Sequence, residues 1–466
     1  LDMRGNPDSG GVWAPCLSHA DGRFWLVYTD VKRLEGSFKD AHNYIVTCDH
    51  IDGDWSDPIY VNSSGFDPSL FHDDDGRKWI MNVQWNHRGA GSGCNSTHPA
   101  FDGILLQEWS PEDGLIGEVR AIYGGTPRGL TEAPHLFKRN GWYYLTTAEG
   151  GTGYNHAVSL ARSREIFGPY EDHPNNHLIT TADAPDHPIQ RTGHGQYVET
   201  PDGDVFHTFL MGRPLPGRFC PMGRETGIER CVWGDDDWLY LEDGGSLPRV
   251  EVPNSVDTTP TARFQTTFAD GQLPIDFQWL RTPFPDRLFR VEPGCLVLIG
   301  RESPGSWFEQ TLVARRQEHA VYRAETTMDF APSSYQQGAG LTTYYNRYKY
   351  HAAIVTWDEK EGRCLRIMSV PGVFPSGAVT MAEVTLTLRP GPVDLAVEVA
   401  GSEQQFFWRQ DGDWHALGGM LDASVISDEG APGEHQSFTG AFVGVMAFDV
   451  SGQAREARVT RFSYRA

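Results

Sequence analysis

Two acidic residues stand where short apolar strands begin. Glu132 opens the strand-like part of GLTEAPHLF, residues 129–137, and Asp67 lies in GFDPSLF, residues 65–71. Carboxyl groups held at the mouths of strands can exchange protons with a ligand if the fold brings them together. The question is therefore which elements position these two side chains.

A repeat of two strands answers it. Four segments share one pattern, in which a short strand, a polar turn ending in glycine and a second strand follow one another. The first strands start near Trp13, Phe66, Glu132 and His194. The turn glycines are Gly22, Gly76, Gly141 and Gly203. Glycine supplies the positive φ that tight hairpins require.

The repeat favours a β-propeller over a sandwich, because units about 50–65 residues apart contain only strands. The first strand of each propeller blade lines the central channel, so equivalent positions converge. These positions hold an indole, two acids and an imidazole: Trp13, Asp67 (beside Phe66), Glu132 and His194. The sequence thus predicts one chemical group per blade at the centre.

Each of these residues has a simpler interpretation. Asp67 precedes a proline and could only start a turn, and Glu132 could be a surface acid. His194 could be a core histidine and Trp13 a packing residue. The shared register favours the functional interpretation for all four together.

The second half follows a different pattern. Residues 246–262 are polar and proline-rich, as in a linker. Beyond them apolar and polar residues alternate, for example in the segment 393–399. Period-two patterning over about 200 residues indicates an antiparallel β-sandwich. The predicted domains are a propeller over 1–245, a linker over 246–262 and a sandwich over 263–466.

Composition limits the partners. The net charge is −23, which argues against nucleic acid and suits a neutral substrate. The chain has no apolar run of about 18 residues, so we expect no membrane span. Seven widely spaced cysteines without a CxxC pair indicate free thiols in a reducing, cytoplasmic compartment.

Several motifs together resemble one family. GNPDSGGVWAPCLS, SSGFDPSLFHDDDGRKW, TEAPHL, YYLTTAEGGTGYNHA, RTGHGQYV, CPMGRETGIE and FTGAFVG are similar to motifs of the β-xylosidases of glycoside hydrolase family 43. The resemblance runs from Gly5 to the C-terminus. It implies an all-β fold, a five-bladed propeller followed by a concanavalin-like antiparallel sandwich.

The resemblance also implies an inverting glycosidase and assigns roles. Such an enzyme needs a general acid on the leaving oxygen and a general base that activates water. Glu132 matches the general acid, and Asp67 matches the acid that orients it and tunes its pKa. The residues that match sugar contacts are Trp13, Trp85, His194, Arg224 and Phe438.

One part of the family pattern is missing. The family's catalytic base is an aspartate in an NPDPS-like motif on the first blade, whereas the NPDS of residues 6–9 leads into second-blade sequence. The chain is therefore interpreted as blades two to five, with the general base not in this chain. Asp8 is a weak substitute, because its motif register is wrong.

Three functions stay open at this point. The first is an exo-acting β-1,4-xylosidase that releases xylose from xylo-oligosaccharides, and the second is an α-L-arabinofuranosidase. The third is a sugar-binding fragment without activity, since the base is absent. We expect no required cofactor, although calcium or water beside His194 are alternatives, and we expect a homo-oligomer, a tetramer or a dimer.

Overall fold

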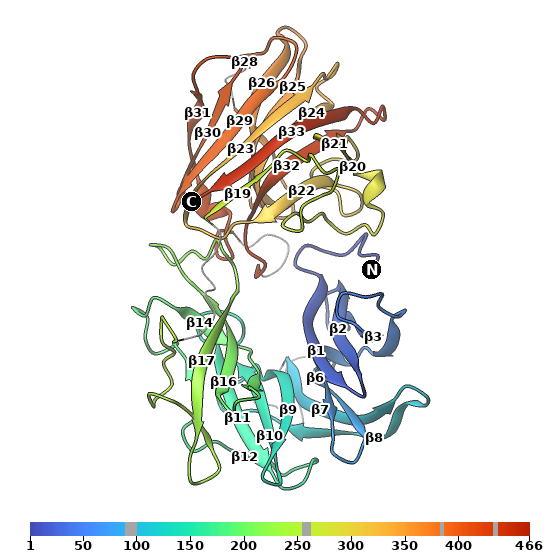
Figure 1. The fold of residues 1–466 in the computed structure, drawn as a ribbon, viewed down its shortest axis with the longest axis vertical. Coiled ribbons are helices and arrows are strands. Elements are labelled where there is room, and N and C mark those ends of the chain that lie inside the picture. The colour runs from blue at the N-terminus through green and yellow to red at the C-terminus, as the bar shows by residue number, and fades with distance from the viewer. Residues whose placement is uncertain (89–99, 254–261, 383–385, 432–436) are drawn as a thin grey trace. The chain divides into compact units, whose positions relative to one another are not determined.

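A computed structural model describes residues 1–88, 100–253, 262–382, 386–431 and 437–466 of the chain. The chain forms two compact units (Figure 1). The propeller unit comprises Gly10–Arg213 and Glu225–Ser255, and the sandwich unit comprises Leu1–Ser9, Pro214–Arg224 and Val256–Ala466. Two short segments that the sequence assigned to the propeller thus group with the sandwich. Residues 254–261 of the predicted linker lie outside the described residues.

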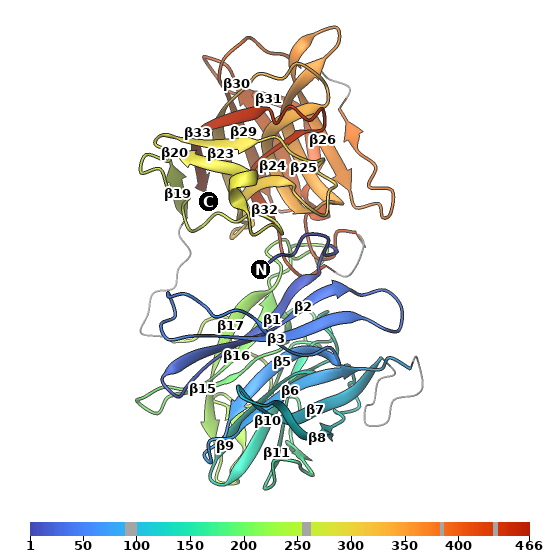
Figure 2. The same ribbon diagram turned by 90° about the vertical axis from the view of Figure 1, so that its right-hand side faces the viewer.

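The propeller unit consists of four antiparallel sheets, which are its blades; the first two are well seen in Figure 2. The first blade contains β1 (Gly11–Ala20), β2 (Arg23–Arg33), β3 (Asp40–Cys48) and β4 (Ile59–Asn62). The second contains β5 (Gly65–His72), β6 (Lys78–Trp85), β7 (Phe101–Ser110) and β8 (Gly114–Tyr123). The third contains β9 (Glu132–Arg139), β10 (Trp142–Glu149), β11 (Ala157–Ser163), β12 (Glu171–Asp172) and β13 (Ile179–Thr180). The fourth contains β14 (Gln190–Gly193), β15 (Tyr197–Glu199), β16 (Val205–Gly212), β17 (Glu225–Trp233) and β18 (Leu239–Leu241).

The predicted hairpins are present in all four blades. The turn glycines 22, 76, 141 and 203 all have φ between 73° and 85°, which an L-residue adopts only with strain. The first strands of successive blades contact one another, β1 with β5 and β5 with β9, as strands around a common channel do. Aromatic and branched side chains from the second strands, such as Trp25, Trp79 and Tyr144, fill the spaces between blades.

A β-bulge interrupts the first strand of every blade. In β9, Glu132 pairs with Ala148 and His135 with Thr146, so three steps on one strand match two on the other. The same extra residue occurs in β1, in β5 and between β14 and β15. The bulged residues all have positive φ: Ala14 (40°), Asp67 (51°), Ala133 (52°) and His194 (49°). For residues other than glycine this conformation costs on the order of 1–2 kcal/mol each.

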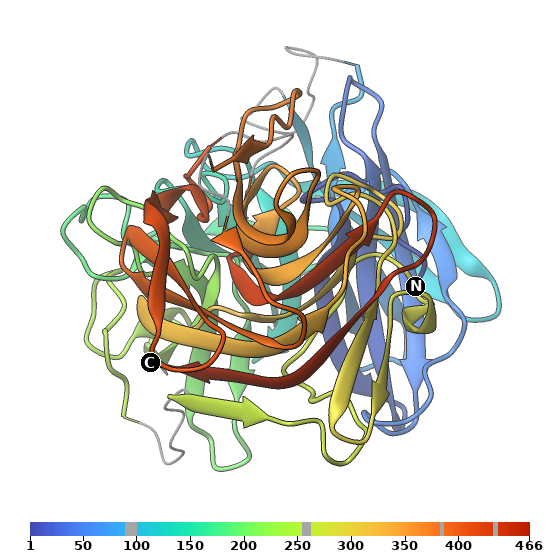
Figure 3. The same cartoon turned by 90° about the horizontal axis from the view of Figure 1, so that it is seen from above.

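The sandwich unit contains two large antiparallel sheets (Figure 3), so the predicted all-β architecture of propeller and sandwich is confirmed. One sheet has the order β20-β21-β33-β23-β29-β30-β31, with β19 paired to β33. Its strands are β19 (Arg263–Thr266), β20 (Phe289–Glu292), β21 (Cys295–Ile299), β23 (Val321–Phe330), β29 (Val393–Ala400), β30 (Glu403–Arg409), β31 (His415–Asp422) and β33 (Glu456–Arg465).

The other sheet has the order β22-β32-β24-β25-β26-β27, with β28 paired to β26. Its strands are β22 (Thr311–Arg316), β24 (Gln337–Asn346), β25 (Lys349–Asp358), β26 (Gly362–Pro371), β27 (Thr380–Met381), β28 (Leu386–Thr387) and β32 (Phe442–Asp449). Two short 3-10 helices, Pro285–Arg287 and Ala423–Val425, complete the unit. No helix among the described residues is long and apolar enough to cross a membrane.

The period-two pattern produces the sandwich core. Tyr322, Ala324, Met328 and Phe330 of β23 are at most 3% exposed and pack with the apolar residues of β29. On the other side of β23, Arg323 donates to Glu325, as the alternation predicts. One face of each strand is therefore apolar and buried, which stabilises a two-layer structure.

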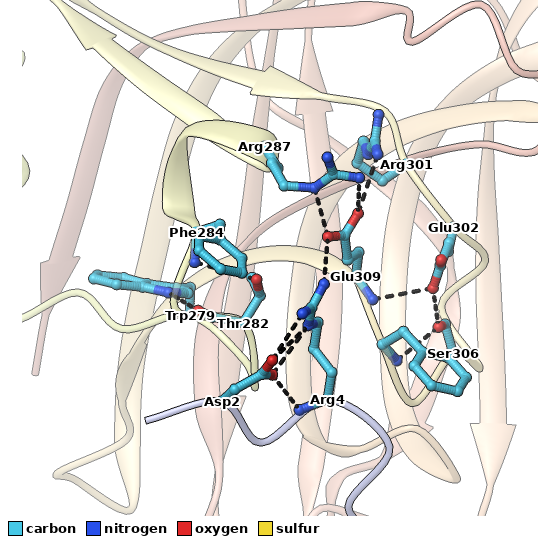
Figure 4. A network of polar contacts seen from close by, with 11 residues as sticks. Asp2, Arg4, Trp279, Thr282, Phe284, Arg287, Arg301, Glu302, Ser306 and Glu309 are labelled. Carbon is cyan, nitrogen blue, oxygen red and sulfur yellow. Dashed lines mark hydrogen bonds and ion pairs between the residues drawn. The ribbon is translucent and has the colours of Figure 1, made fainter. Parts of the chain in front are cut away.

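The N-terminal segment is attached to the sandwich by charge (Figure 4). Glu309 accepts from Arg287 at 2.6 and 2.8 Å and from Arg301 at 3.0 Å, and Arg4 lies 3.6 Å from the same carboxylate. The backbone N–H of Gly5 donates to the Trp307 carbonyl at 2.9 Å. Residues 1–9 thereby become part of the sandwich unit.

Candidate active site

The two acids lie on the first strands of neighbouring blades. Asp67 is the bulged residue of β5, Glu132 is the first residue of β9, and each is only 7% exposed. The pairing register places Glu132 at the position of Trp13 and Phe66, one residue before the bulge. Asp67 and His194 instead share the bulge position. The four residues predicted to converge therefore occupy two adjacent positions of the first strand: Trp13 and Glu132 precede the bulge, whereas Asp67 and His194 occupy it.

Asp67 and His194 are brought together. The Nδ1 atom of His194 lies 3.9 Å from Oδ2 of Asp67, although 127 residues separate them in sequence. A bulge re-aims a side chain relative to a regular strand. Because both residues occupy the same bulge in their blades, their side chains meet.

Polar links hold the first strands in register just behind these groups. The Ser69 hydroxyl donates to the Pro134 carbonyl at 2.5 Å, joining β5 to β9 two residues after Asp67 and Glu132. The Thr146 hydroxyl donates to the carbonyl of Gly195 at 3.4 Å, next to His194. Each catalytic candidate is therefore followed by a contact to another blade, which fixes the direction of its strand.

An aromatic stack runs beside Asp67. Trp13 meets the ring of Phe66 edge-on, with 5.6 Å between ring centres, and Phe66 stacks on Trp85 at 4.4 Å. Trp85 is 9% exposed and also packs on Phe101. Within the propeller unit Trp85 supports Phe66 from behind, and Trp13 is the more exposed end of the stack. That either tryptophan forms a wall for sugar stays a prediction.

Arg224 and Phe438 meet in the sandwich unit. The guanidinium carbon of Arg224 lies 5.2 Å from the centre of the Phe438 ring, a cation–π contact. Both residues lie where their loops cross closely, since a Cβ on Gly223 would come within 2.5 Å of the Gly440 backbone. Their position relative to Glu132, which belongs to the other unit, stays a prediction.

Comparison with known proteins decides the family. Residues 1–239 match the model of glycosyl hydrolases family 43, and residues 265–465 match the beta xylosidase C-terminal concanavalin A-like domain. The chain belongs to glycoside hydrolase family 43.

Relatives in family 43 cover the whole chain. It is 52% identical to the xylosidase/arabinosidase 43B of Humicola insolens, over 100% of this chain and 87% of that protein. It is 42% identical to a beta-xylosidase of Bacillus subtilis, over 100% and 88%. The crystal structure of a xylan beta-1,4-xylosidase from Bacillus halodurans matches with a TM-score of 0.94 and 43% identity, over 100% of this chain and 89% of that chain.

Asp8, the weak substitute for the family 43 base, is held in a different role. It belongs to the sandwich unit, is 4% exposed and lies between two guanidinium groups. Arg281 contacts its Oδ1 at 2.6 Å and Arg347 its Oδ2 at 2.9 Å. Two adjacent cations reduce the proton affinity of a carboxylate, so Asp8 is poorly suited to deprotonate water.

Metal binding is not indicated by a ligand cluster. In the part of the chain that the structure describes, no group of three or more His, Cys, Asp or Glu side chains could hold a metal ion. His194 and Asp67 supply two such side chains, too few for the six to eight oxygens that calcium takes. Calcium beside His194 therefore stays an alternative that needs further ligands.

The sequence analysis missed the residues that hold the Phe438 loop. The Tyr345 hydroxyl donates to Asp428 at 2.5 Å and accepts from the Thr439 N–H at 2.9 Å. Lys349, fully buried, donates to the Ser437 hydroxyl at 2.8 Å. Burial lowers the pKa of Lys349 to about 8. A lysine inside a run of apolar strand residues is the signal that could have revealed this support.

Proposed function

We propose that the chain is the larger part of an inverting, exo-acting β-xylosidase that releases xylose from the non-reducing ends of β-1,4-xylo-oligosaccharides. The observation that carries the proposal is the pair of buried acids, Asp67 and Glu132, at matching strand ends of adjacent blades. The names of the relatives support the substrate class.

In this proposal Glu132 is the general acid. It donates its proton to the glycosidic oxygen while the bond from that oxygen to the anomeric carbon breaks. Asp67 contributes a negative charge on the neighbouring strand. A nearby negative charge disfavours ionisation, so Glu132 keeps its proton near neutral pH and can deliver it.

The general base is proposed to lie in a further blade, outside residues 1–466. An inverting enzyme needs this base about 6.5–9.5 Å from the acid, so that water fits between. The relatives are longer than this chain, which covers 87–89% of their length. Arg224 and Phe438 would contact sugar hydroxyls and a ring face, and His194 would hold Asp67 in place.

An α-L-arabinofuranosidase activity is the second candidate. It is favoured by one specific observation, the 52% identity to a xylosidase/arabinosidase. A pentofuranoside and a xylopyranoside present similar hydroxyl groups, and a hydrophobic pocket separates such close analogues by only about 1–3 kcal/mol. Both activities in one site are therefore compatible with the proposed chemistry.

The test is hydrolysis by residues 1–466 joined to the further blade proposed above, which we call the extended protein, followed by proton NMR. We expect xylobiose to give α-xylose as the first product, the signature of inversion. 4-Nitrophenyl β-xyloside and 4-nitrophenyl α-L-arabinofuranoside, compared at equal concentration, separate the two candidates. β-Xylose as the first product, or no cleavage of either glycoside, would refute the proposal.

Two further expectations belong to it. We propose a homo-oligomer, a tetramer or a dimer, which sedimentation equilibrium measures directly. We also propose a cytoplasmic enzyme. The six cysteines of the described residues are all buried, and fractionation of the source cells would test the location.

A further inference from the structure

A buried polar cluster lies directly before the general-acid candidate. Its centre is Glu149, the last residue of β10, which is fully buried. The Glu149 carboxylate accepts hydrogen bonds from the Thr126 N–H at 2.7 Å, from the Thr126 hydroxyl and from the Thr131 hydroxyl at 3.0 Å. His177 Nε2 lies 2.9 Å from Oε2, the oxygen that also accepts from the Thr126 hydroxyl. We call these four residues the Glu149 cluster.

The cluster holds a charged carboxylate. Burial alone would raise the pKa of Glu149, but hydrogen bonds from His177 and Thr126 outweigh it and leave the pKa below its ordinary value. An ionised carboxylate inside a protein is costly unless donors surround it. Because four donors do so here, the cluster is a rigid anchor whose members cannot move independently.

A second layer fixes the histidine. Arg128 Nε lies 3.3 Å from the His177 ring nitrogens, and its Nη1 donates to the carbonyl and side-chain oxygens of Asn155 at 3.0 and 2.9 Å. A carboxylate only accepts, so the ring hydrogen is assigned to Nε2 beside Glu149, and Nδ1 is the acceptor for Arg128.

One covalent link and one strand pairing lead from the cluster to Glu132. Thr131 is the preceding residue, and Ala148, which precedes Glu149, is the strand partner of Glu132. The backbone between Thr126 and Glu132 is closed by hydrogen bonds, from the Gly129 N–H to the Thr126 carbonyl and from the Gly150 N–H to the Gly129 carbonyl. Glu149 therefore grips the loop at both ends, at Thr126 and Thr131.

The packing around the cluster leaves no room for a side chain at Gly125. A Cβ on Gly125 would lie 1.7 Å from the Thr131 hydroxyl oxygen and 2.8 Å from Oε1 of Glu149. The residues flanking this grip, Leu130 and Ala133, both have a φ of 52°. Such conformations persist only where the surroundings over-determine them, and they are concentrated at functional sites.

We propose that Glu149 is a positioning residue for Glu132: through Thr131 and Thr126 it fixes the backbone that aims the general acid at the leaving oxygen. The inference rests on the proposed function. A buried charge is a poor way to gain stability, since apolar replacements often do as well or better. Precise placement of a neighbouring catalytic group gives the cluster a purpose that packing alone does not.

The leaving group distinguishes this role from a structural one. Cleavage of xylobiose expels the second xylose unit, whose alkoxide is a poor, strongly basic leaving group that needs the proton from Glu132. 2,4-Dinitrophenyl β-xyloside releases a weakly basic phenolate that needs little protonation. A misplaced general acid must therefore slow xylobiose hydrolysis far more than hydrolysis of the dinitrophenyl substrate.

The experiment compares kcat for both substrates in the extended protein, which includes the proposed further blade. Thr131→Val keeps shape and removes the hydroxyl, and we expect xylobiose turnover to fall by about 10–100-fold, the cost of a misplaced group. The dinitrophenyl substrate should change by less than about threefold on the same grounds. Thr131→Ser, which restores the hydroxyl, should recover most of the xylobiose activity.

Glu229→Gln is the matched control. Glu229 is also a buried propeller carboxylate, 2% exposed, and it binds Arg249 with a distance of 2.8 Å to Nε. Its loss should lower the melting temperature and change both substrates equally. If Thr131→Val does not fold, Thr126→Val and Thr126→Ser repeat the comparison at the other end of the loop.

Equal losses on both substrates in the valine variant, or no loss on xylobiose, would overturn the positioning role while leaving the proposed function intact. A wild-type protein that hydrolyses neither substrate would overturn both. Selective loss on xylobiose with recovery by serine would support the inference.

Discussion

The acids of the candidate site in the propeller and two buried acids of the sandwich have different surroundings. In the sandwich, Asp8 lies between two arginines, and Glu309 is bound by Arg287 and Arg301. In the propeller, Asp67 adopts a positive φ at a bulge and faces His194 at 3.9 Å. Guanidinium groups on both sides favour the ionised form of a carboxylate and fix it, whereas the bulge directs Asp67 toward an imidazole.

The different surroundings of these acids predict which substitutions lower stability and which lower activity. The sandwich acids connect segments that are distant in sequence, so their loss should lower the free energy of unfolding. Asp67 occupies a strained position and Glu132 precedes one at Ala133, and such positions cost stability. Activity and stability should therefore respond to different acids, and the following predictions test this division.

The largest effect is expected at Glu132. In the extended protein, which includes the proposed further blade, Glu132→Gln should lower kcat for xylobiose by about 10²–10⁴-fold, because a general acid contributes that much. The melting temperature should stay close to that of the wild type. Glu112→Gln, at an exposed turn, is the control. A large fall in the melting temperature of Glu132→Gln would contradict the prediction that this acid serves activity and not stability.

Asp8→Ala should act in the opposite way. It leaves Arg281 and Arg347 without their shared partner, and removing one member of a buried ion pair costs about 3–5 kcal/mol. Urea unfolding measures this loss. Soluble, well-folded Asp8→Ala protein with wild-type stability and no activity would show that Asp8 is the base after all.

Phe438→Ala tests a sandwich residue that is predicted to contact the sugar. The change removes an aromatic side chain that stacks with Arg224 and should weaken xylobiose binding by about 1–3 kcal/mol. The readout is KM, with little change in unfolding. Phe442→Leu on neighbouring β32 is a control for a change in the sandwich alone. An unchanged KM would contradict a role in the site.

The smallest effect concerns acid stability of the propeller. Burial lowers the pKa of His207 to about 4, below the unfolded value near 6.5. The unfolded chain therefore takes up the proton first, so stability falls as the pH drops from about 6.5 towards 4. By pH 5 this histidine costs up to about 2 kcal/mol. Urea unfolding at pH 7 and pH 5 should show a smaller loss for His207→Gln than for the wild type.

If the free energy of unfolding depends on pH equally in His207→Gln and the wild type, His207 does not contribute to the loss of stability in acid. The pH range matters, because ordinary carboxyl groups titrate mainly below pH 5. His135, whose pKa burial also lowers to about 4, offers an independent second variant in the same unit.

Local patterns in the sequence predicted the architecture well. The turn glycines and aromatic second strands are short-range signals, and they located all four blades. The same repeat directed attention to Asp67, Glu132 and His194. It could not resolve that Glu132 precedes the bulge while Asp67 occupies it, since an extra residue in one strand is visible only against its partner.

Contacts between residues that are far apart in the chain could not be predicted from local sequence patterns. The arginines that bind Asp8 lie 273 and 339 residues away, and no local pattern links them. Glu149 ends an apolar strand next to two glycines, which resembles an ordinary strand end. Its donors come from a loop and from His177, and only the folded chain shows that they converge.

The chain passes back and forth between the propeller unit and the sandwich unit, so the two cannot be separated by one cut in the gene. Residues 1–9 and 214–224 both belong to the sandwich unit, so the chain changes units four times. Recombination at the predicted linker would give a sandwich gene without residues 214–224. This segment contains Gly223, against which the Gly440 loop of the sandwich packs. The two halves are therefore not exchangeable modules. Because residues 1–9 and 214–224 pack with the sandwich, a protease that cuts the linker should leave both fragments in one complex.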